Sequence, residues 1–383
     1  MSPHDRQAGA AAAPGPTVPP EILARRLHRV VDWLAADQLD AAVLCPGSDL
    51  EYLLGVSHGT FERPTFLLVT PDAVATLLVP HLEADQYRNA LTGQDIDQIG
   101  WADGDDPYAR AVAGLGRARR VAVSGTMPAR HILQLQRRLD PECVLVDDGL
   151  SAVRAVKDTW EVQQLTLAGA ALDRVHARLP DLLAPGRTEA AIGQDIAEAM
   201  ADEGFADVGF VSVASGPNGA IPHHTTSTRR LEPADVVVVD ISGPLPTGYH
   251  ADSTRTYALG TPPSDVSTAY AALTEAFDAA RHAARPGVAA GAVDAAARDV
   301  LDAAGLARQF LHRTGHGIGL EVHELPYITP GSPAILQPGM AFSIEPGIYF
   351  PGAWGARIED IVVLGETGAV SVNHRPRALL QVG

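Results

Sequence analysis

The chain has 383 residues, is 46% hydrophobic and carries a formal net charge of −17. This length predicts two or three domains, with enough core to fold without disulfides or structural metals. A negative charge of this size repels phosphate backbones, and no cluster of basic residues offsets it, so nucleic acid is not expected as a partner. No segment approaches the roughly 18 apolar residues that a membrane span needs, so no membrane partner is expected either.

The N-terminal segment, 1–18, has neither the charged start nor the sustained apolar run of a secretion signal. We therefore expect a disordered leader on a cytoplasmic protein. Cys45 and Cys143 lie in separate apolar runs without CxxC spacing. That arrangement favours two core residues over a disulfide or a thiolate metal site.

Residues 19–155 have the pattern of an α/β domain. Apolar residues recur at helical spacing from Pro20 onwards, which predicts that a helix opens the domain. Short apolar runs with β character then alternate with helical stretches, up to a strand ending near Asp147. Strands that alternate with helices indicate an α/β layer fold. A long helical segment begins around Lys157, so we place the domain boundary near residue 155.

The second domain, 156–383, repeats one plan twice. Two predicted helices, 158–184 and 188–204, precede β-rich segments, and two further helices, 264–284 and 291–305, precede another β-rich set. This plan predicts an α+β domain in which two related halves close on one antiparallel sheet with helices outside. The interface between such halves is where we expect a site.

Acidic and imidazole side chains interrupt these apolar β segments. Asp240 ends the run VVVVD, where an uncompensated carboxylate costs several kcal/mol. Alternation along a strand places Asp252 and Thr254 on one face, away from Arg255. The candidate ligand set is Asp240, Asp252, His316, Glu345 and Glu359.

Four carboxylates and one imidazole form a hard ligand set without sulfur. Two divalent cations would balance the four charges, and the donors suit manganese, cobalt, iron or zinc. Without metal, the clustered carboxylates would repel one another. Each residue alone also has a structural alternative: a turn cap for Asp240, a core histidine for His316, and ion pairs with Arg255 or Arg357 for Asp252 or Glu359.

The second domain resembles the pita-bread metallopeptidases, the group of prolidases, aminopeptidases P and methionine aminopeptidases. Residues 158–383 carry the resemblance in four strings, in this order: DISGPLPTGYHADSTRT, TGHGIGLEVHE, SIEPGIY and ARIED. The preceding domain resembles the N-terminal domain of the prolidase, aminopeptidase P and creatinase branch, which methionine aminopeptidases lack. Asp240 and Asp252 are one residue further apart than is usual in the family, which predicts a wider hairpin at GPLPTG.

The resemblance implies a dinuclear centre, with manganese as the first expectation and cobalt, zinc or iron as alternatives. Asp240 would hold one metal, Asp252 and Glu359 would bridge both, and His316 with Glu345 would complete the second. Glu345 would also accept the proton of the attacking water and pass it to the leaving nitrogen.

Further residues match the family outside the ligand set. His223 and His323 would be catalytic, steadying the substrate and the tetrahedral intermediate, and His312 and Arg357 would bind substrate. His224 would face away from His223, and whether it has a role stays open. An unbroken strand would point His316 and His323 to opposite sides, so a bend or bulge is expected among the glycines.

The resemblance favours a metallopeptidase that hydrolyses Xaa-Pro bonds, first as an Xaa-Pro dipeptidase and as a homodimer. An Xaa-Pro aminopeptidase acting on longer peptides is the main alternative, followed by a metal-dependent hydrolase or lyase that acts on non-peptide substrates. Proline bonds lack an N–H, and a site that polarises the carbonyl needs none. A HExxH zinc helix is excluded after His323 because Pro326 breaks a helix and Tyr327 takes the place of the second histidine.

Overall fold

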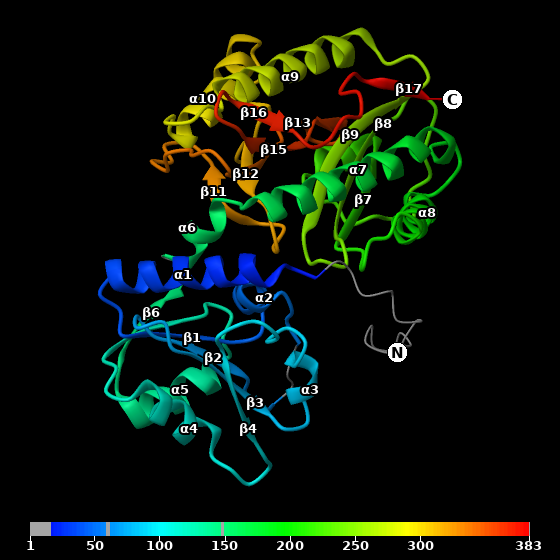
Figure 1. Ribbon diagram of the computed structural model, residues 1–383. Helices are drawn as coiled ribbons and strands as arrows, with labels where there is room; N and C mark the ends of the chain where they lie inside the picture. Colours follow the sequence, from blue (N-terminus) through cyan, green and yellow to red (C-terminus); the bar gives the residue numbers. More distant parts are fainter. Residues whose placement is uncertain (1–16, 59–61, 147–148, 383) are drawn as a thin grey trace. The chain divides into compact units, whose positions relative to one another are not determined.

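The computed structural model describes residues 17–58, 62–146 and 149–382 (Figure 1). The chain divides into two compact units, with the division between Arg154 and Ala155. The leader expected over 1–18 lies outside the described residues except for its last two positions. Among the described helices, none combines the length and apolar character needed to cross a membrane.

The first unit contains a six-stranded mixed sheet in the order β4-β3-β2-β1-β5-β6. β1, β2 and β3 pair antiparallel, whereas β4, β5 and β6 join their neighbours in parallel. The strands are β1 (Ala41–Leu44), β2 (Phe66–Val69), β3 (Ala75–Pro80), β4 (Asp97–Trp101), β5 (Arg120–Val123) and β6 (Glu142–Leu145).

The helices of this unit confirm the predicted α/β alternation. They are α1 (Pro20–Ala36), α2 (Ser48–Leu54), α3 (Ala84–Tyr87), α4 (Pro107–Leu115), α5 (Ala129–Leu139) and α6 (Leu150–Ala155). The helix expected from Pro20 is α1, which buries the predicted apolar stripe, including Leu27 and Leu34. Cys45 is buried and Cys143 half-buried, and both are free thiols.

Four long helices and three sets of strands form the second unit. The helices are α7 (Thr159–Leu182), α8 (Glu189–Asp202), α9 (Ser264–Ala283) and α10 (Ala290–Ala303), close to the predicted bounds. α7 begins at a reciprocal capping box in which Asp158 and Glu161 satisfy each other's backbone N–H groups.

The strands of the second unit fall into two sheets and a hairpin. The first sheet has the order β17-β9-β8-β7, with β17 (Leu380–Val382), β9 (His250–Leu259), β8 (Val236–Pro244) and β7 (Phe210–Ser215). The second has the order β11-β10-β12-β15-β16, with β11 (Glu324–Ile328), β10 (Gly315–Gly317), β12 (Ala341–Ile344), β15 (Asp360–Leu364) and β16 (Ala369–Ser371). β13 (Gly347–Phe350) and β14 (Trp354–Arg357) form the hairpin. All pairs are antiparallel except β17 with β9.

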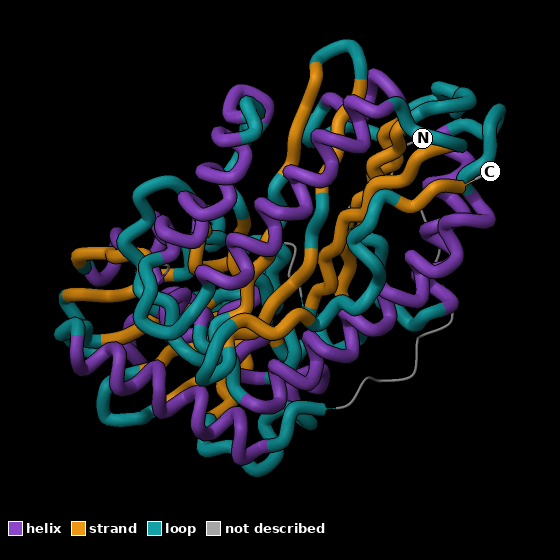
Figure 2. Tube along the Cα trace, turned by 90° about the horizontal axis from the view of Figure 1, so that it is seen from above, coloured by secondary structure: helices purple, strands orange, loops and turns teal. Residues whose placement is uncertain are grey.

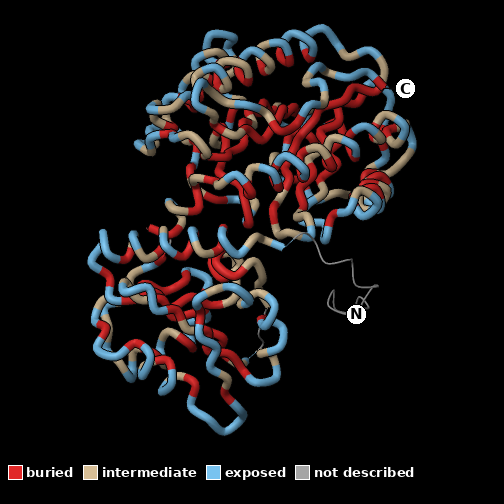
Figure 3. Tube along the Cα trace, viewed as in Figure 1, coloured by how far each residue is buried: buried red, intermediate tan, exposed pale blue. Residues whose placement is uncertain are grey.

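Each pair of helices packs on its own half of the strands. α7 and α8 share an apolar cluster with β7, β8 and β9, whereas α9 and α10 share another with β12 and β15. Figure 2 shows helices on both sides of these strands, and Figure 3 shows that buried residues concentrate in the strands. Each buried Leu, Ile or Phe contributes about 1.5–3 kcal/mol, so these clusters fix the strands on or beside which the candidate ligands lie.

Candidate metal centre

A cavity of about 660 Å³ lies in the second unit and is lined by residues from both halves. The sequence-predicted site residues all line it: His223, Asp240, Asp252, His312, His316, His323, Glu345, Arg357 and Glu359. Residues more than a hundred positions apart therefore meet at one place.

The first two carboxylates are set by the register of β8 and β9. Asp240 pairs with Thr254, and Asp252 pairs with Ser242 two positions along, so the two aspartates are diagonal neighbours on one face. The register stays regular as far as the pair formed by the last residue of β8 and the first of β9. The extra residue in the spacing between Asp240 and Asp252 is therefore accommodated in the connecting turn over 245–249.

His316 lies in β10, where glycines allow three strands to come close together. A Cβ on Gly317 would overlap the backbone carbonyl of Leu325 in β11. The register between β10 and β11 shifts between His316 and Gly317, which is the irregularity expected from the sequence. As a result, the rings of His316 and His323 meet edge to face, with centroids 4.2 Å apart.

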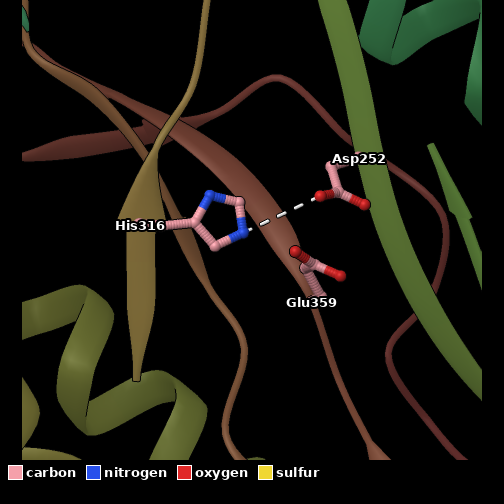
Figure 4. Close-up of side chains that lie close together, drawn as sticks. All are labelled: Asp252, His316 and Glu359. Carbon is pink, nitrogen blue, oxygen red and sulfur yellow. Dashed lines mark ion pairs between the residues drawn. The ribbon is translucent and has the colours of Figure 1, made fainter. Parts of the chain in front are cut away.

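The tautomer of His316 follows from its hydrogen bonds. Nδ1 lies 3.0 Å from the carbonyl oxygen of Gly317, and because a carbonyl can only accept, Nδ1 carries the proton. Nε2 then presents a lone pair 3.2 Å from Glu345 Oε1 and 3.8 Å from Asp252 Oδ2, the second contact being drawn in Figure 4. Burial lowers the pKa of His316 to about 3, so the ring is in the neutral form that binds metals.

Glu345 and Glu359 lie where strands are interrupted. Glu345 follows β12 and precedes Pro346, which has no N–H to continue the ladder. Ser343 Oγ donates to Glu345 Oε1 at 3.1 Å. Glu359 lies between β14 and β15, and its Oε2 accepts from Thr254 Oγ1 at 2.7 Å. Both carboxylates are thus oriented by hydroxyl groups on neighbouring residues of the sheets.

The tightest group contains three of the five predicted ligands. Asp252, His316 and Glu359 each place one donor atom within 4.8 Å of the others (Figure 4). Glu345 joins them through its contact with His316. Asp240 instead forms an ion pair with Arg357, with Oδ2 2.6 Å from Nη2.

The ion pairs suggested as structural alternatives differ from those observed. Arg255 points away from the cavity and pairs with Asp360 at 2.7 Å, not with Asp252 or Glu359. Arg357 pairs with Asp240, a combination that the sequence did not indicate. The bridging candidates therefore have no guanidinium partner among the described residues.

The electrostatics of the cavity fit divalent cations. Burial, and then the neighbouring carboxylates, raise the pKa of Asp252 and Glu359 well above their usual range. Burial also raises the pKa of Glu345 to about 7. Four carboxylates around one lone-pair nitrogen, with one of them paired to Arg357, give the oxygen-rich donor set that manganese, cobalt, iron or zinc ions accept.

His312 belongs to a hydrogen-bonded chain on the wall of the cavity. Its Nδ1 donates to the carbonyl oxygen of Arg313 at 2.7 Å, and its Nε2 accepts from the hydroxyl of Tyr349 at 2.8 Å. Arg357 Nη1 donates to the same hydroxyl at 2.8 Å. Burial lowers the pKa of His312 to about 3, so this ring is neutral as well.

Sequence reasoning missed Tyr349 and Arg313. Tyr349 lies in β13, four positions after Glu345, and its place in the motif SIEPGIY was the available signal. Arg313 follows His312 directly and also lines the cavity, with its guanidinium 4.5 Å from the ring centroid of Tyr327. Among the described residues no carboxylate lies within ion-pair distance of Arg313.

Comparisons with known proteins agree with this geometry. Residues 163–366 match metallopeptidase family M24, and residues 26–156 match the creatinase/prolidase N-terminal domain. The chain is 52% identical over 364 residues to the probable dipeptidase PepE of Mycobacterium tuberculosis, covering 94% of this chain and 97% of the relative. It is 33% identical over 364 residues to an Xaa-Pro dipeptidase of Lactobacillus helveticus, covering 92% and 98%.

A solved structure is similar over nearly the whole chain. The crystal structure of dipeptidase PepE from Mycobacterium ulcerans superposes with a TM-score of 0.91 at 51% identity, covering 96% of this chain and 100% of that one. These matches confirm the predicted fold class, a creatinase-type α/β domain followed by a pita-bread catalytic domain. They also make the protein an enzyme that hydrolyses peptides. The chain belongs to metallopeptidase family M24, in its prolidase-like branch.

Proposed function

We propose that this enzyme is a two-metal Xaa-Pro dipeptidase. The observation that carries the proposal is the convergence of four carboxylates and the Nε2 lone pair of His316 on one cavity. The relatives named dipeptidase and Xaa-Pro dipeptidase support the substrate class. Manganese is the first expectation for the metal, with cobalt, zinc or iron as alternatives.

The proposed ligands are Asp240, Asp252, His316, Glu345 and Glu359. When bound, two divalent cations would polarise the scissile carbonyl and lower the pKa of the attacking water. Asp240 would leave its contact with Arg357 or share it, because one carboxylate can accept from a guanidinium and still offer its other oxygen.

The remaining steps belong to the protein's own side chains. Glu345 would take the proton of the attacking water and deliver it to the proline nitrogen, which becomes a secondary amine on cleavage. His223 and His323, both exposed at the cavity, would donate hydrogen bonds to the substrate carbonyl oxygen as negative charge develops there. His312 and Arg357 would shape the substrate pocket through Tyr349.

Arg313 favours a dipeptidase over an aminopeptidase. A dipeptide carries its free carboxylate one residue after the scissile bond, so the carboxylate would lie within the cavity. Arg313 lines that cavity and has no carboxylate partner among the described residues. We propose that its guanidinium binds the C-terminal carboxylate of the substrate, an interaction that a longer peptide or an amide cannot make in the same place.

The test compares Ala-Pro, its amide Ala-Pro-NH2 and the tripeptide Ala-Pro-Ala after metal removal and after adding back manganese, cobalt or zinc. We expect metal-restored cleavage with the free dipeptide as the best substrate. Arg313→Gln should lower kcat/KM for Ala-Pro by about 10- to 100-fold, the usual worth of a hydrogen bond to a charged group, and leave the amide little changed. Arg308→Gln, at an exposed arginine of the short helix Ala307–Gln309, is the matched control.

The outcomes separate the alternatives. A preference for Ala-Pro-Ala would make the enzyme an Xaa-Pro aminopeptidase. Bound metal without cleavage of any of the three would indicate a hydrolase or lyase with other substrates. We also propose a cytoplasmic homodimer, which light scattering of the purified protein and fractionation of the source cells would test.

A further inference from the structure

Two adjacent histidines in the connection between β7 and β8 have opposite surroundings. His223 is exposed and lines the cavity, whereas His224 is buried. The Nε2 atom of His224 lies 2.8 Å from Oε2 of Glu189, the first residue of α8. His224, whose role the sequence left open, is therefore bonded to a helix on the outside of the sheet.

Glu189 is fully buried and accepts six hydrogen bonds. All six donors belong to the segment 215–227, which includes His223. The donors are the N–H and Oγ of Ser215 at 2.8 and 2.7 Å, Asn218 Nδ2 at 3.0 Å, His224 Nε2 at 2.8 Å, and the N–H and Oγ of Ser227 at 3.0 and 2.6 Å. One carboxylate thus binds the beginning, the middle and the end of the loop.

The N-terminus of α8 holds the same loop from its own side. The N–H groups of Glu189 and Ala190 donate to the carbonyl oxygens of Arg229 and Ser227, at 3.0 and 2.9 Å. Burial alone would raise the pKa of Glu189, but hydrogen bonds from Ser227 and Ser215 hold that pKa at about 2. The side chain is therefore a carboxylate at every pH at which the enzyme would work, at a helix end that favours negative charge.

His223 has no comparable support of its own. Among the described residues, no hydrogen bond reaches its imidazole ring, so the place of the ring depends on the backbone of the loop. The backbone is fixed next to it, because the carbonyl of His224 accepts from Ser212 Oγ at 2.9 Å and its ring bonds to Glu189. We propose that Glu189 is a positioning residue that holds His223 at the substrate, acting through His224 and the loop.

This inference rests on the proposed function, in which His223 contacts the substrate carbonyl. A displacement of about 1 Å at such a group can cost about 100-fold in rate. Glu189→Gln preserves the shape of the side chain but turns an NH2 group towards backbone and side-chain donors, so several of the six bonds cannot form. The loop should therefore loosen while the metal ligands on the strands keep their places.

The experiment is a double-mutant cycle on hydrolysis of Ala-Pro by the manganese-loaded enzyme. We expect Glu189→Gln to lower kcat/KM by about 10- to 100-fold, and His223→Ala by about 100-fold or more. The double variant should match His223→Ala within about threefold, because no positioned ring is left to displace. Glu198→Gln, an exposed glutamate on the same helix, is the matched control and should leave the rate unchanged.

A second variant and a second measurement guard against misfolding. His224→Ala removes one donor and leaves the other five bonds to Glu189, and it should reduce the rate about tenfold, again without effect once His223 is gone. Hydrogen exchange should rise over 215–227 in Glu189→Gln while β8 and β9 stay protected. Manganese affinity should be unchanged in both variants, because neither residue is a proposed ligand.

Two results would overturn the inference in distinguishable ways. Additive losses in the double variant, or unchanged exchange over 215–227, would refute the positioning role and leave the proposed function intact. If His223→Ala hydrolysed Ala-Pro at the rate of the unaltered enzyme, His223 would have no role at the substrate. That part of the proposed function would then be wrong, and holding the ring in place would serve no catalytic purpose.

Discussion

Removal of the metals should make the stability of the enzyme fall as the pH rises towards neutrality. The metal-free cavity brings four carboxylates together, and burial raises the pKa of Glu345 from its ordinary 4.5 to about 7. A carboxyl with a higher pKa in the folded than in the unfolded state stabilises the fold at low pH, and this contribution is lost as the pH rises through the folded value.

The size of the effect follows from Glu345 alone. Each unit of pKa shift corresponds to about 1.4 kcal/mol, so the free energy of unfolding should fall by on the order of 3 kcal/mol between pH 4.5 and about pH 7. The pKa values of Asp252 and Glu359 are raised as well, so their contributions have the same sign.

Urea unfolding of dialysed, metal-free protein across this pH range measures the slope directly. Glu345→Gln, which cannot ionise at this position, should show a smaller slope than the unaltered chain. Manganese added at neutral pH should restore stability, because metal binds only the folded state well. A metal-free stability that stays level or increases between pH 4.5 and pH 7, or an equal slope in Glu345→Gln, would refute the reasoning.

Three substitutions test the support around the cavity. Thr254→Val removes the hydroxyl that donates to Glu359, so manganese affinity should fall about 10- to 100-fold in a calorimetric titration. Arg255→Met leaves the fully buried carboxylate of Asp360 with one guanidinium in place of two and should cost about 3–5 kcal/mol in urea unfolding. Lys157→Met removes the ammonium group that pairs with the buried carboxylate of Glu324 on β11 and should cost about 3–5 kcal/mol.

These substitutions have control substitutions, and each has a result that would contradict its prediction. Thr268→Val, on the exposed face of α9, should leave manganese affinity unchanged, and equal affinity in Thr254→Val would contradict the orienting role of its hydroxyl. Arg178→Met breaks surface ion pairs on α7 and should cost less than about 1 kcal/mol. If Arg255→Met and Lys157→Met each lowered the free energy of unfolding by less than about 1 kcal/mol, these buried ion pairs would contribute no more than surface ones.

Long periodic segments and strand alternation were readable in the sequence. The four helices of the catalytic unit follow from apolar spacing sustained over many turns. Alternation also placed Asp252 and Thr254 on one face, and the structure confirms that Thr254 reaches Glu359 there. Local patterns suffice when a feature depends on neighbours along one element.

Two short elements had no readable pattern. α2 has only 7 residues between two glycines, and three of the five residues in β4 are exposed, so neither produces a sustained apolar pattern. The need for an irregularity between His316 and His323 could be predicted from odd spacing, but its place could not. It depends on how closely β10, through its glycines, approaches β11.

Polar pairs between residues far apart in the sequence could not be predicted either. Asp240 and Arg357 are 117 positions apart, and the sequence suggested Asp252 or Glu359, not Asp240, as the partner of Arg357. Glu189 has the position of an ordinary first-turn helix acid, and its six donors begin 26 residues later. Such partners depend on which strand and loop the fold brings alongside, so sequence spacing alone does not identify them.

The most direct test of the central claim is a manganese titration of metal-free enzyme that records bound metal and Ala-Pro hydrolysis together. Activity should be absent at first and develop as up to two ions bind per chain, and Asp252→Asn should weaken metal binding and abolish activity together. Full hydrolysis without bound metal, or stoichiometric binding that Asp252→Asn leaves unchanged, would contradict the claim.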